Sequence, residues 1–255
     1  MLTDELNPAP QAAEAPQHDV RLSVVLPAYA EAENLAVLLG KLQQVLGTLP
    51  APTEILVIDA VESLDDTPTI CAQFGAQCVH RRGGNEYGNA IRTGIATSAG
   101  EYVIIMDVDG SHDPEFITQL WAAREQADVV IASRYMRGGS TENPALLVWC
   151  SKFLNGIFKL FLQLPVWDIS NSYRIYRGEE LRKLELEFMH FDIQEEMLAK
   201  LLWNPAHPVI VREIPFRFQR RLHGKSKRSM AVFLVAFLGA MIRLYLLKQT
   251  LTGKK

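Results

Sequence analysis

Tyr102-Val103-Ile104-Ile105-Met106-Asp107-Val108-Asp109 is the stretch of sequence around which we expect the chain to fold. Its apolar half is too short for a helix and rich in β-branched residues, which predicts a buried parallel strand. At the carboxyl end of that strand, Asp107 and Asp109 would stand where open α/β sheets bind their ligands. Side chains two residues apart on an extended chain point the same way, so both carboxylates could bind one divalent cation. The alternative is a strand that ends in a polar turn, because Asp109-Gly110-Ser111 is also a turn sequence.

Strands and helices are predicted to alternate at short intervals around this central strand. Apolar runs predict further strands at Leu22–Leu26, Glu54–Asp59, Gln77–His80 and Asp128–Ser133. Leucine spacing and helix start signals predict helices over Glu31–Leu46, from Thr67, from Gly88 to about Thr97, and from Asp113. This alternation is typical of a parallel sheet wrapped by helices, so the predicted fold class is α/β, with a Rossmann-like part up to about residue 137.

Several classes of protein are excluded or disfavoured by missing motifs. No Gly-x-Gly-x-x-Gly follows the first strand, which argues against a dinucleotide cofactor, and no P-loop motif is present. Cys71, Cys78 and Cys150 lack the spacing of a metal site, which fits buried thiols in a reducing compartment. Residues 1–19 lack the charge and apolar core of a signal peptide, so we predict a disordered leader and a cytoplasmic protein.

The positive charge is concentrated at the carboxyl end. The net charge is −3, yet Ile214–Lys255 holds ten Lys or Arg residues and no Asp or Glu. A basic tail on an acidic body indicates an anionic partner there, namely a phosphate, a nucleic acid or a membrane surface. The interleaved apolar residues favour lipid over nucleic acid.

Several short motifs resemble those of family 2 glycosyltransferases, which have the GT-A fold. They are Pro27–Asn34, Asp59, Asp107-Val108-Asp109 and Ser133-Arg134-Tyr135. Later segments are similar to the polyprenyl- and dolichyl-phosphate mannosyltransferase branch, at Asp168–Arg177, Gln194–Met197 and Arg221–Lys227. The motifs follow the family's order from Arg21 to Arg228, so their joint specificity is high. We therefore expect a GT-A domain over residues 20–228 and a membrane-associated tail over 229–255.

The resemblance implies a role for each matched residue. Asp107, Asp109 and Arg134 would be catalytic, and Asp107, Asp109 and Ser111 would hold Mg²⁺ or Mn²⁺. Donor binding would involve Pro27, Tyr29, Glu31, Asp59, Val108, Arg221 and Lys227. We assign Lys152, Arg174, Gln194 and Glu196 to the acceptor side.

The sequence departs from the family at three places and leaves some roles open. Ala60 stands where the family often has an aspartate, the loop Val61–Thr67 is one residue longer, and His223 replaces a tyrosine. These departures leave the donor base and sugar open. Asp168 could instead brace Arg174 in an internal ion pair.

Other polar residues also have competing interpretations. Gln194 and Glu196 lie on the same side only if their segment is extended. Arg220 and Arg221 could be a solvated charge run. The histidines at 112, 190 and 207 lack metal-ligand spacing and are expected to be packed or exposed.

Two apolar segments suggest contact with a membrane. Ala145–Leu164 is apolar apart from Ser151, Gln163 and a stripe formed by Lys152, Asn155 and Lys159. It is therefore either a core helix or a helix in the bilayer interface. Met230–Leu247 is apolar except for Arg243 and is flanked by positive charge on both sides. This favours an in-plane or re-entrant anchor, or docking onto a membrane protein, over a spanning helix.

These observations predict an inverting, metal-dependent glycosyltransferase on the cytoplasmic face of a membrane. The donor would be a nucleotide sugar, GDP-mannose by resemblance, and the acceptor a polyprenyl phosphate. A phosphate acceptor is already ionised and needs no general base, although Glu196 or Asp192 could serve an alcohol. The alternatives are the same fold with a UDP-sugar donor or a saccharide acceptor in envelope polysaccharide synthesis, and a catalytically silent membrane-binding module.

Overall fold

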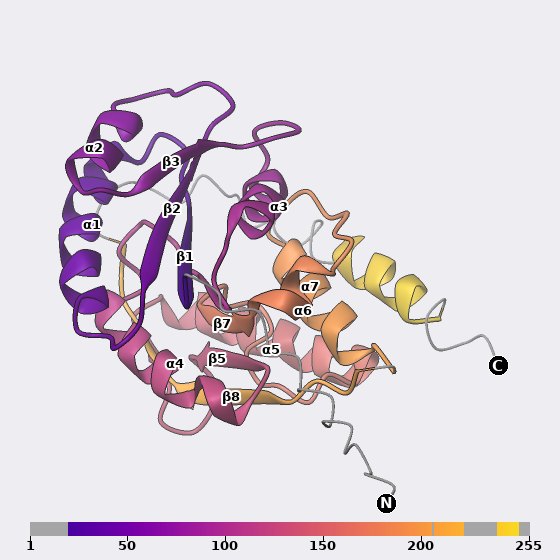
Figure 1. The fold of residues 1–255 in the computed structure, drawn as a ribbon. Helices are drawn as coiled ribbons and strands as arrows, with labels where there is room; N and C mark the ends of the chain where they lie inside the picture. Colours follow the sequence, from indigo (N-terminus) through magenta and orange to yellow (C-terminus); the bar gives the residue numbers. More distant parts are fainter. Residues whose placement is uncertain (1–19, 206, 222–238, 250–255) are drawn as a thin grey trace, which may run out of the picture.

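One mostly parallel sheet forms the centre of the protein in a computed structural model that describes residues 20–205, 207–221 and 239–249 (Figure 1). The sheet has seven strands in the order β3-β2-β1-β4-β7-β5-β8. Their bounds are β1 Leu22–Pro27, β2 Thr53–Asp59, β3 Gln77–His80, β4 Tyr102–Ile105, β5 Val129–Ser133, β7 Arg174–Arg177 and β8 Val211–Pro215. The predicted α/β fold class is confirmed, and the predicted leader at residues 1–19 lies outside the described residues.

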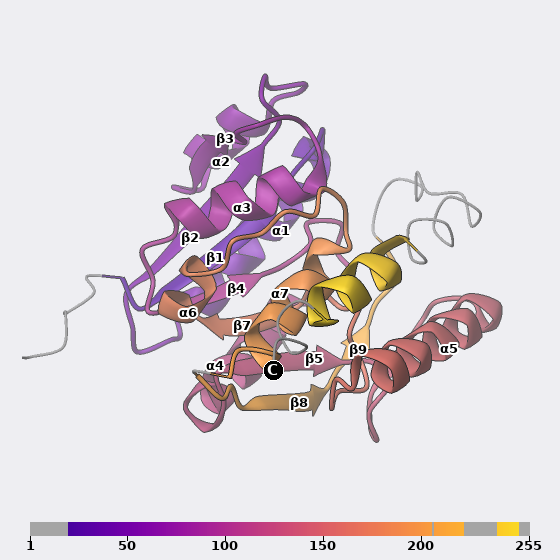
Figure 2. The same cartoon turned by 90° about the vertical axis from the view of Figure 1, so that its right-hand side faces the viewer.

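Helices cover both faces of the sheet. One face packs against α1 (Ala32–Leu46), α2 (Thr67–Gln73) and α4 (Ile117–Ala123). The other face packs against α3 (Tyr87–Thr97), α5 (Ala145–Leu162), α6 (Gly178–Arg182), α7 (Ile193–Leu202) and a helix over residues 239–249. The views in Figures 1 and 2 show this last helix beside α7. The remaining elements are the 3₁₀ turns η1 (Pro114–Phe116) and η2 (Arg124–Gln126) and a two-stranded sheet of β6 (Ser140–Thr141) and β9 (Arg217–Phe218).

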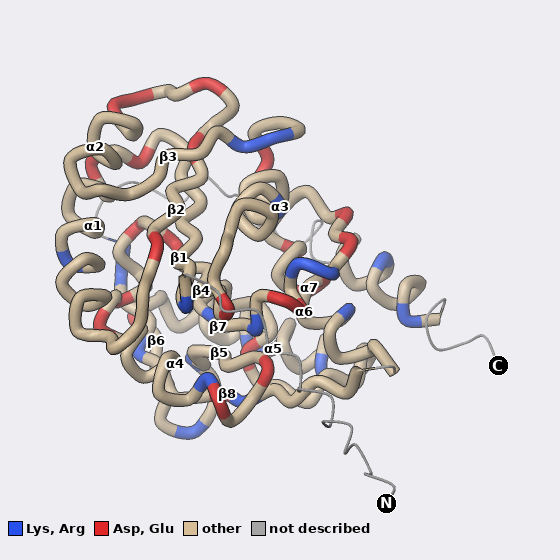
Figure 3. Tube along the Cα trace, viewed as in Figure 1, with Lys and Arg blue, Asp and Glu red and all other residues tan. Residues whose placement is uncertain are grey.

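Buried apolar side chains explain why these elements form where they do. β1 and β4 carry no charged residue (Figure 3), and their side chains are buried on both faces of the sheet. Leu35, Leu39 and Leu42 of α1 are fully buried against one face, and each contributes about 1.5–3 kcal/mol. On the other face α3 lies so close that a Cβ on Gly94 would be 2.3 Å from Val25 Cγ1.

The antiparallel strand β7 positions the segment before it. β7 lies between β4 and β5, and Arg174 pairs with Ile105 of β4 and Ile131 of β5. Ile105 ends β4, so residues 168–173 lie at the carboxyl edge of the sheet, next to the acids that follow β4. We did not predict β7, because a four-residue strand that begins and ends with arginine lacks an apolar strand pattern.

The predicted helix starts agree with the structure to within a few residues. Asp113 caps the helix that follows, accepting a hydrogen bond from the Glu115 N–H at 3.2 Å. Its first turn is the 3₁₀ turn η1, so α4 begins only at Ile117. The predicted helix at 145–164 ends at Leu162, because Gln163 adopts a left-handed conformation with φ of 57°.

Candidate active site

The predicted acids follow strands that end at one edge of the sheet. Asp59 ends β2, and Asp107 and Asp109 follow β4, with β1 between these two strands. Two strand spacings, roughly 10 Å, therefore separate the two positions. Asp59 is fully buried, and its carboxylate accepts hydrogen bonds from the Ala60 N–H and the Ser63 hydroxyl, both at 2.7 Å. A nucleobase could reach Asp59 only if Ser63 moved away.

Asp109 is held from its own loop and paired with a residue from the far end of the chain. Its Oδ1 accepts hydrogen bonds from the Ser111 hydroxyl at 2.6 Å and the Ser111 N–H at 3.0 Å. Its Oδ2 lies 2.9 Å from Arg221 Nε, and the Arg221 side chain is 46% exposed. The Arg221 guanidinium thus neutralises one oxygen of a nearly buried carboxylate and remains accessible from solvent.

Asp107 is the more open of the two acids, with 26% of its side chain exposed. Its Oδ2 accepts a hydrogen bond from the Ser172 hydroxyl at 3.1 Å. The Tyr87 hydroxyl lies 3.5 Å from Oδ1, at the long limit of a hydrogen bond. Asp107 is therefore oriented by α3 and by the segment before β7.

His112 lies inside the protein and connects the loop after β4, which carries Asp107, to the segment before β7. The Asp107 N–H donates to His112 Nδ1 at 3.0 Å, so the ring proton lies on Nε2 and donates to Asn171 Oδ1 at 3.1 Å. His112 is fully buried and stacks on Tyr173. Burial lowers the His112 pKa, against the opposing effect of Asp107 and Asp109. The sequence left open whether this histidine is packed or exposed, and the structure shows that it is packed, with bridging hydrogen bonds that were not predicted.

Arg134 is fixed by Asp168. The Arg134 guanidinium donates to both carboxylate oxygens, from Nε at 2.8 Å and from the terminal nitrogen at 2.7 Å. Burial alone would lower the Arg134 pKa, but the adjacent Asp168 carboxylate raises it. The predicted alternative, in which Asp168 braces Arg174, is wrong, because Arg174 bonds instead to the carbonyls of Ile169 and Gln194.

The residues assigned to the acceptor side lie at different depths. Arg174 and Glu196 are fully buried, and Glu196 accepts hydrogen bonds from the Glu187 and Phe188 N–H groups, both at 2.9 Å. These contacts give both residues a structural role. Gln194 is also buried, whereas Lys152 lies on α5 with its ammonium 5.8 Å from the centre of the Tyr135 ring.

The expected nucleoside end is built around a residue that we did not predict. Arg81 is almost fully buried and donates to the carbonyls of Ala28, Ile58 and Asp59, at the ends of β1 and β2. Its guanidinium lies 5.5 Å from the centre of the Tyr29 ring, which is 41% exposed. An arginine within a loop carries no spacing signal that would have identified this role. Of the other predicted donor residues, Pro27 ends β1, Val108 is buried between the acids and Glu31 accepts a hydrogen bond from Asn34.

The chemistry of the acids fits a divalent cation. Asp107 and Asp109 offer carboxylate oxygens, the ligand type that Mg²⁺ and Mn²⁺ prefer. Arg221 already places a positive charge against Asp109, which indicates that the carboxylate can balance a cation there. Ser111 serves to orient Asp109. The described residues contain no group of three or more His, Cys, Asp or Glu that could hold a metal, and Lys227 lies outside them.

Helix α5 exposes most of its apolar residues. Leu146, Trp149, Phe153 and Leu160 are exposed by 57–74%. The helix is therefore not a fully buried core helix: Leu154, Phe158 and Leu162 pack into the core, and the other side of the helix is exposed. Asn155 is not part of an exposed stripe, because it is buried and accepts a hydrogen bond from the Ile169 N–H at 2.7 Å.

Length and hydropathy would let α5 span a membrane, and it is the one helix in the described part of the chain for which this holds. The first half of the predicted segment Met230–Leu247 lies outside the described residues. In the second half, Arg243 pairs with Asp192 at 3.2 Å.

Comparison with known proteins places these residues in a family context. Residues 23–184 match the sequence profile of Glycosyl transferase family 2. The chain is 31% identical over 222 residues to polyprenol monophosphomannose synthase of Mycolicibacterium smegmatis, with 82% of this chain and 81% of that protein covered. It is 29% identical over 225 residues to undecaprenyl-phosphate mannosyltransferase of Micrococcus luteus, covering 82% and 88%.

A third relative is longer than this chain. Dolichol-phosphate mannosyltransferase of Pyrococcus furiosus is 29% identical over 220 residues, and the match spans 82% of this chain but only 59% of that protein.

Solved structures with the same architecture include glucosyl-3-phosphoglycerate synthase from Mycobacterium tuberculosis. Its complex with Mn²⁺, uridine diphosphate and phosphoglyceric acid has a TM-score of 0.68 at 19% identity, covering 90% of this chain and 78% of that chain. Its complex with Mg²⁺ and uridine diphosphate has a TM-score of 0.64 at 19% identity, covering 92% and 80%. At this level of identity the likeness establishes the fold, which is the GT-A fold that we predicted.

Proposed function

The chain belongs to glycosyl transferase family 2, and on this basis we propose that it transfers mannose from GDP-mannose to a polyprenyl phosphate with the help of Mg²⁺ or Mn²⁺. By their names, two of the relatives reported above are mannosyltransferases of dolichol phosphate and undecaprenyl phosphate, and the other is a polyprenol monophosphomannose synthase. The Arg221–Asp109 ion pair carries the proposal, because it joins two of the family-like motifs across 112 positions of the chain at a separation of 2.9 Å.

The metal would be held by Asp107 and Asp109. When bound, the cation would stabilise the negative charge that develops on the departing nucleoside diphosphate. Arg221 would turn from Asp109 to the phosphates, which its exposed side chain permits. Ser111 and His112 keep the two carboxylates and their loop in place.

The acceptor side uses charge rather than proton transfer. Because a polyprenyl phosphate is already an anion, it does not need a general base to remove a proton. It needs instead a positively charged side chain that holds its phosphate in position. Arg134 is suited to this role because Asp168 fixes its guanidinium while the Asp107 carboxylate lies close enough to raise its pKa further. The buried position of Glu196 removes it from the candidates for a base in this structure.

The exposed apolar face of α5 is proposed to lie in the bilayer interface. Along this face, apolar residues recur every seven residues, at Leu146, Phe153 and Leu160, and Lys152 and Lys159 flank it. Such a face fits insertion to the depth of the headgroups, with lysines near anionic lipid. The basic carboxyl-terminal tail would hold the enzyme to the cytoplasmic leaflet, where a lipid phosphate can reach the active site without leaving the bilayer.

A donor and acceptor panel tests this proposal. The purified protein is incubated with a short-chain polyprenyl phosphate, Mn²⁺ and one nucleotide sugar at a time, and lipid-linked sugar is measured. We expect mannosyl-phospholipid from GDP-mannose and none in the presence of a chelator. A product formed only from a UDP-sugar, or only with a saccharide acceptor, would replace the proposed substrates, and no product with any pair would favour a silent membrane-binding module.

A further inference from the structure

Tyr87 and Gln194 form a polar pair beside the acids. Gln194 lies in the first turn of α7 and donates from Nε2 to the Tyr87 hydroxyl at 3.1 Å. Tyr87 begins α3, and its hydroxyl lies 3.5 Å from Asp107 Oδ1. The Tyr87 ring stacks on Phe191 with the ring centres 4.0 Å apart. The pair thus connects two helices at the more exposed of the two acids.

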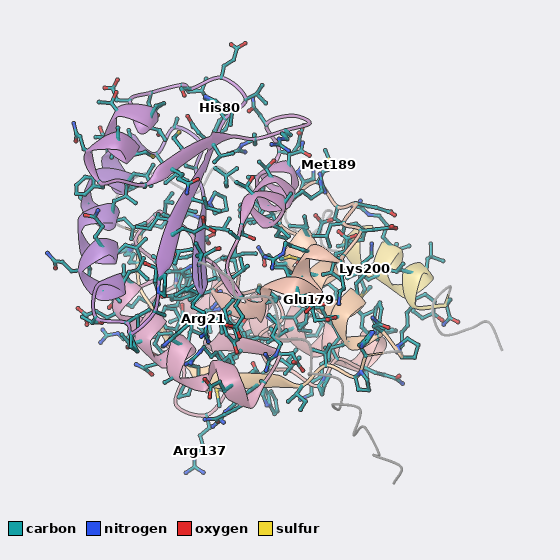
Figure 4. The ribbon with its side chains drawn as sticks, viewed as in Figure 1. Arg21, His80, Arg137, Glu179, Met189 and Lys200 are labelled. Atoms are coloured by element: carbon teal, nitrogen blue, oxygen red, sulfur yellow. The ribbon has the colours of Figure 1, made fainter. Side chains whose placement is uncertain are left out.

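The surrounding backbone fixes this pair. The Gly88 N–H donates to the Met189 carbonyl at 2.8 Å, and Met189 lies beside the amino end of α3 (Figure 4). A Cβ on Gly88 would be 2.2 Å from the Phe188 carbonyl oxygen, so only glycine allows this approach. Glu196 holds the same segment through its hydrogen bonds to the backbone. Tyr87 and Gln194 are therefore set in place before any substrate arrives.

One group of the pair lacks a partner. Gln194 Oε1 has no hydrogen bond to any described residue, although Gln194 is only 1% exposed. Leaving a buried carbonyl unpaired costs about 1–3 kcal/mol. If the oxygen and nitrogen of the amide were exchanged, the nitrogen would lack the partner instead. In either orientation, one polar group of the buried amide has no hydrogen-bond partner among the described residues.

We propose that Tyr87 and Gln194 bind a hydroxyl group of the hexose that is transferred, an inference that rests on the proposed function. The Tyr87 hydroxyl lies next to Asp107, and Gln194 is hydrogen-bonded to that hydroxyl. The transferred sugar of a metal-bound nucleotide donor must lie beside the same acid. A sugar hydroxyl can donate to the amide oxygen. Gln194 therefore belongs to the donor sugar rather than to the acceptor side, where we first assigned it.

Such a pair would determine specificity. A site built to form hydrogen bonds with a hydroxyl discriminates strongly against a sugar that lacks it, because its buried polar groups are then left unpaired. The donor is thus selected at this position by its pattern of hydroxyl groups.

The test compares binding of GDP-mannose with binding of GDP, both with Mn²⁺, by calorimetry. Tyr87→Phe removes one oxygen, and Gln194→Met keeps the length of the side chain but removes both amide groups. Gln194→Met should bind GDP-mannose about tenfold more weakly and GDP within about twofold of the wild type. Tyr87→Phe, whose lost hydroxyl also contacts Asp107, should weaken the binding of GDP-mannose more than the binding of GDP. Deoxy analogues of GDP-mannose then identify the hydroxyl, because the wild type should discriminate against one analogue and both variants should not.

The matched control is Tyr102→Phe, which removes the hydroxyl of a buried tyrosine at the opposite end of β4. It should bind both ligands as the wild type does. Equal weakening of GDP and GDP-mannose in Tyr87→Phe and Gln194→Met, or no weakening of either, would overturn the inference. The proposed function is judged separately by mannosyl transfer in the wild type. If the donor panel selects another sugar nucleotide, that donor and its nucleoside diphosphate replace the GDP pair.

Discussion

Asp168 holds the guanidinium that the reaction is proposed to use, although it lies outside the acid motif. Its carboxylate is fully buried, and the Arg134 side chain is 10% exposed. Removing one member of a buried pair leaves an uncompensated charge. Asp168→Ala should therefore lower the free energy of unfolding by about 3 kcal/mol in urea titrations and reduce transfer even under conditions where the variant is folded.

The control for this prediction is a solvent-exposed ion pair. Glu179 contacts Lys183 at 2.7 Å, with side chains exposed by 77% and 53%. Glu179→Ala should leave stability and transfer nearly unchanged. If Asp168→Ala proved as stable and active as Glu179→Ala, the importance of the Asp168–Arg134 pair would be refuted.

Some residues of the site could be predicted from the sequence, and others could not. The pattern of an apolar strand followed by Asp107 and Asp109 was informative, because strand geometry alone places both side chains on one side. The residues that hold the site carried no such pattern. His112 and Asn171 are hydrogen-bonded although they lie 59 positions apart, and only the packing of β7 against β4 brings them together. For the same reason, the sequence suggested Arg174 as an alternative partner of Asp168, whereas the structure pairs Asp168 with Arg134.

At the scale of secondary-structure elements, the start of α1 depends on a loop that follows β2. The Asp65 carboxylate accepts hydrogen bonds from the Ala32 N–H at 2.8 Å and the Thr67 hydroxyl at 2.7 Å. Partial burial alone would raise the Asp65 pKa, but these hydrogen bonds lower it below its ordinary value. The contribution of Asp65 to stability is therefore present above the unfolded-state pKa and is lost as pH falls through the folded-state pKa.

Asp65→Ala should accordingly destabilise the protein by about 1 kcal/mol at neutral pH. The difference from the wild type should shrink as pH falls below about 4, because the Asp65 carboxylate is then protonated first in the unfolded state and, at lower pH, in the folded state. Asp66→Ala is the control, since Asp66 makes no capping hydrogen bond to α2. Urea unfolding at several pH values measures both, and a difference for Asp65→Ala that does not change with pH would contradict the role of its charge.

Helix α5 carries the prediction about the membrane. Phe153 and Leu160 are exposed by 57% and 74%, and burial of such a side chain contributes about 1.5–3 kcal/mol. Phe153→Glu and Leu160→Glu should each weaken binding to anionic lipid vesicles about tenfold or more in sedimentation assays. Transfer to a short, water-soluble prenyl phosphate should persist in both variants.

Val37→Glu provides the comparison, because Val37 is 55% exposed on α1, on the opposite side of the sheet. This variant should bind vesicles like the wild type. Equal vesicle binding by the wild type and both α5 variants would contradict a membrane contact through this helix.

Elements differed in how well the sequence predicted them. Strands β1, β2, β4 and β5 contain apolar runs, so their positions were close to those observed. β7 was missed because its buried Arg174 finds its partners only in the folded protein. The position of α5 was predicted, but its environment was not, since an apolar helix has the same pattern whether it faces a core or a bilayer.

On the scale of the whole molecule, one edge of the sheet gathers residues from across the chain. Asp107 comes from the loop after β4, Arg134 follows β5, Ser172 precedes β7 and Arg221 follows β9. The order of the strands brings these loops together, and the exposed face of α5 extends beyond the sheet (Figure 2). If this edge is the active site, its acids should support sugar transfer to a lipid phosphate only when a divalent cation is present.

The most direct test is the initial rate of mannosyl-phospholipid formation from GDP-mannose by wild type, Asp109→Ala and the distant control Asp66→Ala, with Mn²⁺ and with a chelator. We predict that Asp109→Ala and the chelator each lower the rate by a factor of about 10³, while Asp66→Ala matches the wild type. A wild-type rate in Asp109→Ala, or a rate that the chelator leaves unchanged, would contradict it.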